Sequence, residues 1–440
     1  MTSASPSVPV VRVAILGCGA VGAALVAHLQ SRADDLAVQS GARIEIAGVA
    51  VADLSRSRPD HVAKDLLTDD AASLVADPSV DIVVELIGGL EPAGSLVRAA
   101  LEAGKPVVTA NKALLASEDG IQLREVAHRK GVDLLYEAAV AGAVPLVRVL
   151  RESLTGERIH RVMGIVNGTT NFILTKMSDN RTEYAEVLAE AQELGLAERD
   201  PTADVEGHDA AAKTAILAGI AMGYDVVTSD VQREGITHIE SVDIEFADRF
   251  DYVVKLLAVV ERIGADEISA RVHPAMVPKS HPLAGVRDAF NAVFIEGEWA
   301  GELMLYGQGA GGMPTASAVV GDLIDAVRNL LARTTSPVPE RRPGRIYPVA
   351  DLRSAYYLTV DVEDRPGVLG LVSTVFGEHH VSIRSMEQIE QVELVGPARL
   401  IFLTHAAREG DMNDTIDALA ALEAVKRVGS TIRVFGDDAP

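Results

Sequence analysis

The chain has 440 residues, enough for about two to four domains, and 48% of them are apolar although only 4% are aromatic. Its 63 acidic and 40 basic residues give a net charge of −23, which opposes binding to nucleic acid or anionic lipid. No window resembles a membrane span and the start does not resemble a signal peptide, so we expect a globular, cytoplasmic protein with small-molecule partners. The single cysteine, Cys18, excludes an internal disulfide and fits a reducing compartment.

The first segment with a clear pattern, residues 11–29, reads VRVAILGCGAVGAALVAHL and predicts a strand, a glycine turn and a helix. Gly17, Gly19 and Gly22 form G-x-G-x-x-G, which suits a tight turn, close approach of the backbone to a pyrophosphate, and close contact of helix and strand. Further strands are predicted at residues 44–51, 81–86 and 106–109, with helical segments between them. The alternation predicts a Rossmann-like doubly wound parallel sheet.

A second α/β domain is predicted beyond a boundary near residues 139–145. Its strands are expected at residues 158–166, 268–272 and 289–295, and its helices at residues 183–194, 210–222 and 249–263. The glycine-rich stretch YGQGAGGMPTASAVVGDLIDAV then leads into an amphipathic helix, with Thr315 or Ser317 available to cap it. We expect this helix to return the chain to the first domain.

A segment rich in proline, arginine and serine follows and predicts a linker. The pattern after it, strand, helix, two strands, helix and strand, predicts a small third domain. The predicted organisation is a dinucleotide-binding domain over residues 1–140, a catalytic and oligomerisation domain over residues 141–306, a return segment over residues 307–332, a linker over residues 333–350 and the C-terminal domain over residues 351–440.

Two opposite charges interrupt an apolar run: Asp209 and Lys213 lie four residues apart in GHDAAAKTAILAG. A helix here has no polar face, so it is predicted to be buried on most sides. On a surface such a pair contributes only about 0.3–0.5 kcal/mol, whereas buried ions are costly and are kept where charge is used. We therefore interpret the pair as functional. The loop before it carries Glu198, Asp200, Asp204 and Glu206, which can be solvated surface or can hold a cationic amino group.

Two further groups of polar residues stand in apolar surroundings. Asn167, Thr169 and Thr170 lie where a helix can begin, and the sequence leaves open whether they cap that helix or serve a site. Asn111 and Lys112 follow a strand of the first domain. Because ligands of open parallel sheets bind outside the carboxyl ends of the strands, Lys112 is placed to meet a cofactor or a substrate.

Seven segments, taken together and in order, resemble the homoserine dehydrogenase family over roughly residues 10–330. They are GCGAVG, VTANKALL, YEAAVAGAVP, IVNGTTNFIL, GLAERDPTADVEGHDAAAKTAIL, EGI and YGQGAGGMPTASAVVGD. The tail, with DRPGVLG between a strand and a helix, resembles an ACT regulatory domain, which has a ferredoxin-like fold. The resemblance implies reversible hydride transfer between NAD(P)H and L-aspartate 4-semialdehyde, giving L-homoserine for threonine and methionine biosynthesis.

The resemblance also implies roles for individual residues. Lys213 would be the general acid and base at the carbonyl oxygen, with Asp209 and Lys112 completing the catalytic set. The substrate would be held by Glu198, Asp204 and Asp209. The cofactor would contact Gly17, Gly19, Ala20, Val21, Gly22, Thr109, Lys112 and Gly311. A sodium-like cation, which members of the family bind, would use Glu137 and the carbonyl groups of Val140, Gly142 and Val144.

The choice between NAD and NADP stays open. Asp53, after the second strand, favours a free ribose hydroxyl, and Ala52 stands where many relatives have a basic residue. Arg56 and Arg58 can still meet a 2′-phosphate.

Two rival functions compete with this interpretation. An aldehyde-oxidising semialdehyde dehydrogenase needs a nucleophilic cysteine, and Cys18 lies in the glycine turn, so this function is disfavoured. A cofactor-binding amino-acid sensor without catalysis is the other alternative, and the joint presence of Lys213, Asp209, Glu198 and Lys112 argues against it. For the tail, we expect threonine as the effector. Since an isolated βαββαβ unit has open sheet edges, we also expect pairing with a copy, giving a homodimer or homotetramer.

Overall fold

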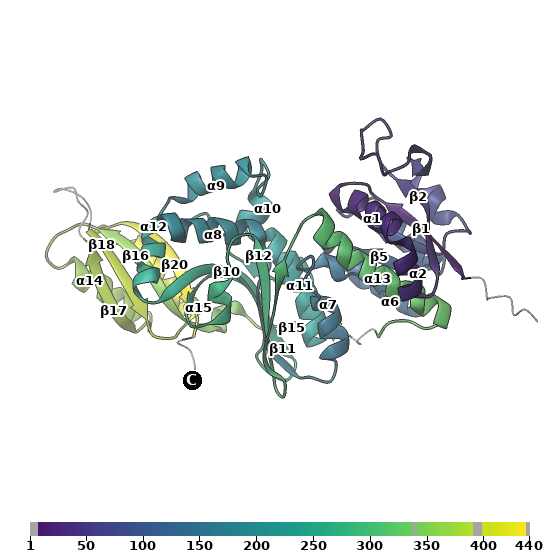
Figure 1. Cartoon of the computed structure of the whole chain (residues 1–440). Coiled ribbons are helices and arrows are strands. Elements are labelled where there is room, and N and C mark those ends of the chain that lie inside the picture. Colours follow the sequence, from purple (N-terminus) through teal and green to yellow (C-terminus); the bar gives the residue numbers. More distant parts are fainter. Residues whose placement is uncertain (1–7, 338–340, 390–397, 437–440) are drawn as a thin grey trace, which may run out of the picture. The chain divides into compact units, whose positions relative to one another are not determined.

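The computed structural model describes residues 8–337, 341–389 and 398–436 (Figure 1). The chain divides into two compact units. The first unit contains Met1–Ile159, Ala212–Asp230 and Asn291–Pro343, and the second contains His160–Ala211, Val231–Phe290 and Gly344–Pro440. Part of the predicted linker, residues 338–340, lies outside the described residues. Among the described helices, none combines the length and the apolar composition that a membrane crossing requires.

The first unit is built on a six-stranded parallel sheet in the order β3-β2-β1-β4-β5-β6. Its strands are β1 (Val10–Leu16), β2 (Arg43–Ala50), β3 (Leu67–Thr68), β4 (Ile82–Glu85), β5 (Val107–Thr109) and β6 (Leu134–Leu135). The central strands are buried on both faces, as their apolar runs predict. The predicted doubly wound parallel sheet is therefore confirmed.

Helices cover both faces of this sheet: α1 (Ala20–Ser31), α2 (Ala33–Ser40), α3 (Ala71–Ala76), α4 (Ala93–Glu102), α5 (Lys112–Leu115) and α6 (Glu118–Lys130). A helix from far along the chain, α13 (Gly312–Ala332), packs against α1, α2 and β5 (Figure 1). Its apolar face, which includes Val319 and Leu323, belongs to the same core as β1 and α1. The expected caps of α13 were wrong. Gly311 is the cap residue, while Thr315 and Ser317 lie inside the helix.

The first unit also contains short elements: α7 (Leu146–Arg148), β8 (Tyr224–Asp225), which pairs with β14 (Arg342–Pro343), and the neighbouring strands β12 (Phe290–Gly297) and β13 (Gly301–Gln308). The division between the units falls inside α11 (His208–Met222), between Ala211 and Ala212. Residues of α11 are buried at nearly every position, as its composition predicts.

The second unit contains β7 (Ile159–Ile165), β10 (Tyr252–Arg262) and β11 (Glu267–Pro278), paired antiparallel in the order β7-β10-β11. Its helices include α8 (Gly168–Asn180), α9 (Tyr184–Glu193), α10 (Thr202–Val205) and α12 (Ser241–Arg249). The helix predicted over residues 249–263 was wrong, because this stretch is the strand β10. Seven consecutive residues of β10 are buried, so its apolar run shows no alternation and resembles a buried helix.

The C-terminal part of the second unit has the predicted βαββαβ order: β16 (Arg353–Val362), α14 (Val368–Glu378), β17 (Ile383–Ile389), β18 (Ala398–Thr404), α15 (Glu409–Ala420) and β20 (Val425–Val434). Its strands lie antiparallel in the order β20-β16-β18-β17, with both helices packed on the sheet (Figure 1). Phe376 of α14 and Phe402 of β18 meet in its core, with ring centroids 4.8 Å apart. This is a ferredoxin-like fold.

One premise about this part of the chain was wrong: the β20 edge of its sheet is not open. Arg433 and Val434 of β20 pair in parallel with Ala275 and Met276 of β11. The guanidinium group of Arg433 also donates to the carboxylate of Glu234, at 2.7 and 2.8 Å. The C-terminal sheet therefore continues into β11 of the same chain. The argument for self-association from open edges applies, among the described strands, only to the β17 side.

Candidate active site

The geometry of the turn between β1 and α1 explains why each of the three motif positions is a glycine. Gly17 has φ 104°, and a Cβ there would lie 2.6 Å from the carbonyl oxygen of Leu86. A Cβ on Gly22 would collide with the carbonyl oxygen of Gly17. A Cβ on Gly19 would have no neighbouring atom within 4 Å, so open space lies before the N-terminus of α1. The two outer glycines allow close packing, and the central one leaves room for a phosphate at a helix N-terminus.

The predicted cofactor residue Gly311 lies beside this turn. It has φ 124° and precedes α13, and a Cβ on Gly312 would lie 3.0 Å from the carbonyl oxygen of Ala20. The structure thus brings Gly311 together with Ala20 and Val21 at the start of α1, although about 290 residues of sequence separate them.

A residue that the sequence analysis missed, Glu85, organises the carboxyl ends of β4 and β5. It is fully buried, and the hydroxyl of Thr109 donates to its Oε2 at 2.6 Å. The amides of Ile87 and Gly88 donate to its Oε1 at 2.7 and 2.9 Å. A glutamate that ends a buried strand is the signal that could have revealed it. Thr109, predicted to contact the cofactor, is held in place by this carboxylate.

Lys112 is the first residue of α5 and is half-buried. The preceding residue, Asn111, caps this helix by accepting the amide of Leu114 at 3.1 Å, and its Nδ2 donates to the carbonyl of Gly89 at 2.7 Å. Asn111 therefore fixes the position of Lys112 at the carboxyl edge of the sheet, where the sequence placed it.

The loop after β2 carries the residues that bear on cofactor choice. The carboxylate of Asp53 accepts both the amide and the hydroxyl of Ser55, at 2.8 and 2.6 Å. The guanidinium of Arg58 donates to the carbonyl groups of Asp53 and Arg56, each at 2.8 Å. Burial raises the pKa of the Cys18 thiol, and the nearby Arg58 opposes that rise. Arg58 thus lies between this loop and the glycine turn.

Glu137, the proposed cation ligand, is buried and already strongly hydrogen-bonded. Its carboxylate accepts the amides of Val147 and Arg148 at 2.9 and 2.7 Å, and its own amide donates to Asp322 at 2.7 Å. Burial raises the pKa of Glu137, and burial raises that of Asp322 to about 7. Asp322, which the sequence analysis did not single out, therefore belongs to the same polar cluster.

The predicted carbonyl ligands lie on the turn that follows Glu137. The backbone there is left-handed at Ala141 and Gly142, and the carbonyl of Val144 accepts the amide of Leu146 at 2.8 Å. Among the described residues, no group of three or more His, Cys, Asp or Glu side chains forms a metal site. A cation here would be held by the single carboxylate of Glu137 together with backbone carbonyl oxygens, a set of ligands that suits a hard monovalent ion.

Asp209 and Lys213 lie on successive turns of α11, and each is less than a tenth exposed. Since residues four apart share a face of a helix, both charges point the same way from a buried segment. Within the second unit, Nδ2 of Asn167 donates to Asp204 at 2.7 Å and to Asp209 at 2.9 Å. Asn167 also caps α8, which confirms the capping role, while its role in a site stays a prediction.

The remaining predicted substrate residue, Glu198, has an exposed side chain in the loop before α10. Its backbone carbonyl accepts the side-chain amide of Gln192 at 3.0 Å, which ties this loop to α9. Thr169 is also bound to the loop, through the carbonyl of Leu196 at 2.8 Å. The loop is thus anchored while the carboxylate of Glu198 faces solvent.

Comparison with protein families covers most of the chain. Residues 17–137 match the family model described as homoserine dehydrogenase, NAD binding domain; residues 145–324 match the model for homoserine dehydrogenase, and residues 356–424 match that of the ACT domain. With the parallel sheet and its glycine turn, these matches make the protein an NAD(P)-dependent oxidoreductase that carries an ACT domain.

Individual relatives support the same family. A homoserine dehydrogenase of Corynebacterium glutamicum is 49% identical over 434 residues, covering 97% of this chain and 96% of the relative. One of Mycobacterium tuberculosis H37Rv is 48% identical, with coverage of 97% and 98%. The chain belongs to the homoserine dehydrogenase family.

Solved structures support the same assignment. The crystal structure of a homoserine dehydrogenase from Thiobacillus denitrificans has a TM-score of 0.91 at 39% identity, covering 98% of this chain and 99% of that one. A hyperthermophilic archaeal homoserine dehydrogenase, solved in complex with NADPH, has a TM-score of 0.61 at 29% identity, covering 72% and 97%.

Proposed function

We propose that this homoserine dehydrogenase interconverts L-homoserine and L-aspartate 4-semialdehyde with NADP, in the cytoplasmic synthesis of threonine and methionine. The observation that carries the site assignment is the pair Asp209 and Lys213 on the buried helix α11, with Asn167 hydrogen-bonded to Asp209. A buried lysine beside ordered carboxylates has the chemistry that proton transfer at a substrate oxygen requires.

Lys213 acts on the oxygen of the substrate. When the aldehyde is reduced, negative charge develops on its oxygen, and the Lys213 ammonium stabilises that charge and donates the proton. In the reverse direction the neutral amine accepts the proton of the homoserine hydroxyl. Lys112, held at the carboxyl edge of the parallel sheet by Asn111, assists where cofactor and substrate meet.

Carboxylates hold the amino group of the substrate. Asp209 and Asp204 are ordered by the amide of Asn167, and Glu198 adds a third negative charge from the neighbouring loop. An ammonium group is a suitable partner for such a set, because opposite charges attract, and most strongly at the buried carboxylate of Asp209.

The cofactor, which accepts or supplies hydride when bound, fits the residues at the glycine turn. The open space at Gly19 and the N-terminus of α1 suit its pyrophosphate, with Ala20, Val21 and Gly311 beside it. Preference for NADP rests on Arg58, whose Nε is buried without a hydrogen-bond partner among the described residues. A 2′-phosphate would supply one, whereas the carboxylate of Asp53 is occupied by Ser55.

Sodium, held by Glu137 and the carbonyls of Val140, Gly142 and Val144, is part of the proposal. The support is electrostatic. Two carboxyl groups, Glu137 and Asp322, are buried close together with raised pKa values, and a cation would offset their mutual repulsion.

Threonine is proposed as an effector of the ACT domain, in a homodimer or homotetramer. The turn before α14 supports this, because Gly367 adopts φ 92° as the cap residue and α14 begins directly after it. Amides at a helix start suit the carboxylate of an amino acid. We retain the predicted division of the chain, in which residues 351–440 form this regulatory domain.

One assay tests the core of the proposal. Oxidation of NADPH and of NADH is followed with L-aspartate 4-semialdehyde, with and without threonine. We expect turnover with both cofactors, a higher kcat/KM with NADPH, and inhibition by threonine. Absence of turnover would favour the alternative function, a cofactor-binding amino-acid sensor without catalysis. A rate that threonine does not change would contradict the proposal that threonine is the effector. As a structural control, Gly367→Ala strains the left-handed position and should weaken inhibition without altering substrate KM.

A further inference from the structure

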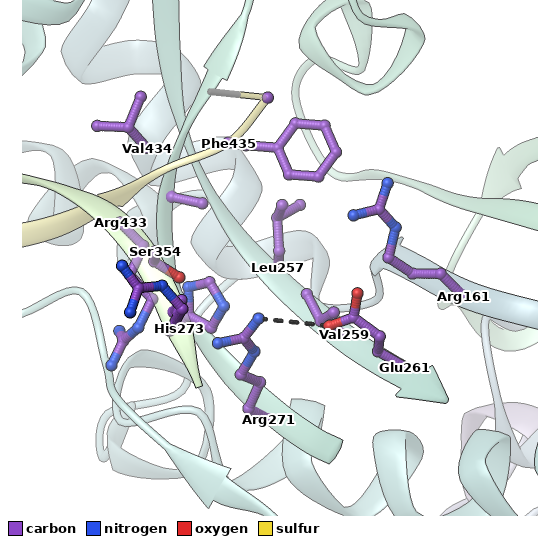
Figure 2. A pocket seen from close by; sticks show the side chains of 13 residues that line it. Arg161, Leu257, Val259, Glu261, Arg271, His273, Ser354, Arg433, Val434 and Phe435 are labelled. Carbon is purple, nitrogen blue, oxygen red and sulfur yellow. Dashed lines mark ion pairs between the residues drawn. The ribbon is translucent and has the colours of Figure 1, made fainter. Parts of the chain in front are cut away.

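A cavity of about 330 Å³ lies within the second unit, where β11 meets β20 and β16 (Figure 2). Its lining in the described part of the chain includes four arginines and one carboxylate: Arg161, Arg271, Arg353, Arg433 and Glu261. The apolar side chains of Leu257, Val259, Val434 and Phe435 complete its walls. None of the residues assigned above to substrate, cofactor, cation or threonine lines it.

The four arginines are not equivalent. Arg433 is neutralised by Glu234 and Glu409, and Arg353 donates to the carbonyl of Ala406 at 2.8 Å. Arg161 lies over the ring of Phe435, with its guanidinium carbon 5.1 Å from the ring centre. Their positions are therefore fixed by contacts of the protein itself.

Arg271 differs, because its positive charge is only weakly neutralised by a nearby carboxylate. Its ion pair with Glu261 is long, at 3.7 Å, and is the dashed line in Figure 2. Two of its donors, Nε and Nη1, are buried without a hydrogen-bond partner among the described residues. A buried cation whose donors are unpaired destabilises a fold, so its retention needs another reason.

His273 lies next to Arg271 on the same face of β11 and is only 5% exposed. Its Nδ1 lies 3.0 Å from the carbonyl of Pro274 and must donate to it, which leaves Nε2 as an acceptor. That Nε2 is also buried and has no partner among the described residues. Burial, Arg433 and Arg271 lower the pKa of His273, so the ring is neutral at pH 7.

We propose that this cavity binds a small hydroxycarboxylic acid, whose carboxylate pairs with Arg271 and whose hydroxyl donates to Nε2 of His273. Both buried, unpartnered groups are thereby satisfied by one ligand. The ligand would touch β11 together with β16 and β20, and so would join the strands of the ACT domain to the neighbouring sheet of the same unit.

The test uses a matched pair of probes, L-malate and succinate, which differ by one hydroxyl group. Calorimetry on the full chain should show L-malate binding at least tenfold more tightly than succinate, because succinate leaves the His273 acceptor unpaired. His273→Phe should abolish this discrimination. Arg271→Gln should weaken both probes at least tenfold, whereas Arg345→Gln, at an exposed arginine on β15 (Arg345–Ile346), should change neither.

Thermal unfolding provides a second readout. Arg271→Gln should unfold at the same or a higher temperature than the parent chain without ligand, and should lose the rise in Tm that L-malate causes. The proposal is overturned if neither probe binds the parent chain, or if Arg271→Gln binds as the parent does. A chain that ends at Gly436, and so lacks Asp437 and Asp438, serves as a comparison with the full chain. The proposal is also overturned if L-malate binds only this shortened chain, or if Arg271→Gln changes the oligomeric state while binding is unaltered.

Discussion

The side-chain amide of Asn167 donates a hydrogen bond to the carboxylate of Asp209 at 2.9 Å. The same nitrogen donates to Asp204 at 2.7 Å, while the amide oxygen accepts the backbone amide of Thr170 at 2.9 Å. One side chain therefore caps α8 and sets the separation of two carboxylates, which links the start of that helix to the proposed substrate site.

Two substitutions separate these roles of Asn167. Asn167→Ser keeps an N-cap oxygen but cannot bridge the carboxylates, whereas Asn167→Ala loses both functions. We expect both variants to raise KM for homoserine, and only Asn167→Ala to lose about 1 kcal/mol of unfolding free energy. Steady-state kinetics and chemical denaturation measure the two effects. Equal stability and unchanged KM in both variants would show that the bridge has no functional role.

Lys213→Ala should lower kcat by roughly two to four orders of magnitude, the range for loss of a positioned acid or base. Lys213→Arg is the matched control, because it keeps the positive charge but does not deprotonate near neutral pH. If proton transfer is the role, arginine will not restore turnover. Near-normal kcat in Lys213→Ala, with a native circular dichroism spectrum, would remove Lys213 from the mechanism.

Glu198→Gln should chiefly raise KM for homoserine and leave kcat close to that of the parent, since it removes a charge partner of the ammonium group and not a reacting group. Glu193, also exposed and at the end of α9, provides the control substitution Glu193→Gln. A parallel loss in both variants would indicate a general effect of surface charge.

Arg58→Gln should lower kcat/KM for NADPH more than tenfold while altering that for NADH little, because only NADP carries the 2′-phosphate. Arg56→Gln, on the same loop but at an exposed side chain, should have a smaller effect. The ratio of the two specificity constants is the measurement, and an unchanged ratio in Arg58→Gln contradicts the assignment.

The raised pKa of Asp322 predicts how stability depends on pH. In the folded chain Asp322 holds its proton up to about pH 7, whereas an unfolded aspartate releases it near pH 4. The folded state thus binds more protons in this interval, and this group makes the free energy of unfolding fall as pH rises through it. Asp322→Asn should remove that contribution. The measurement is the free energy of unfolding from pH 4 to 8 in the parent chain and in Asp322→Asn. Repeating it in sodium chloride and in choline chloride tests the cation as well, because bound sodium would reduce the slope of this free energy against pH.

Several features of the fold follow from local sequence. The glycine spacing and the apolar strand before it predicted the turn at Gly17, since backbone conformation and close packing there exclude side chains. The composition of α11 predicted its burial. The βαββαβ order of the tail was predicted as well, because each of its elements carries its own period and its own turn signals.

Other features depended on contacts between distant residues. β10 was predicted as a helix, because burial on both faces removes the alternation that distinguishes a strand. Glu85 and Asp322 gave no periodic signal, and their partners, Thr109 and Glu137, lie 24 and 185 residues away. The pairing of β20 with β11, which closes one sheet edge, has no local signature either. The sequence by itself determined most of the elements, β10 excepted, and the polar residues of the proposed site. The tertiary structure decided which polar groups meet, because hydrogen bonds join atoms by distance in space.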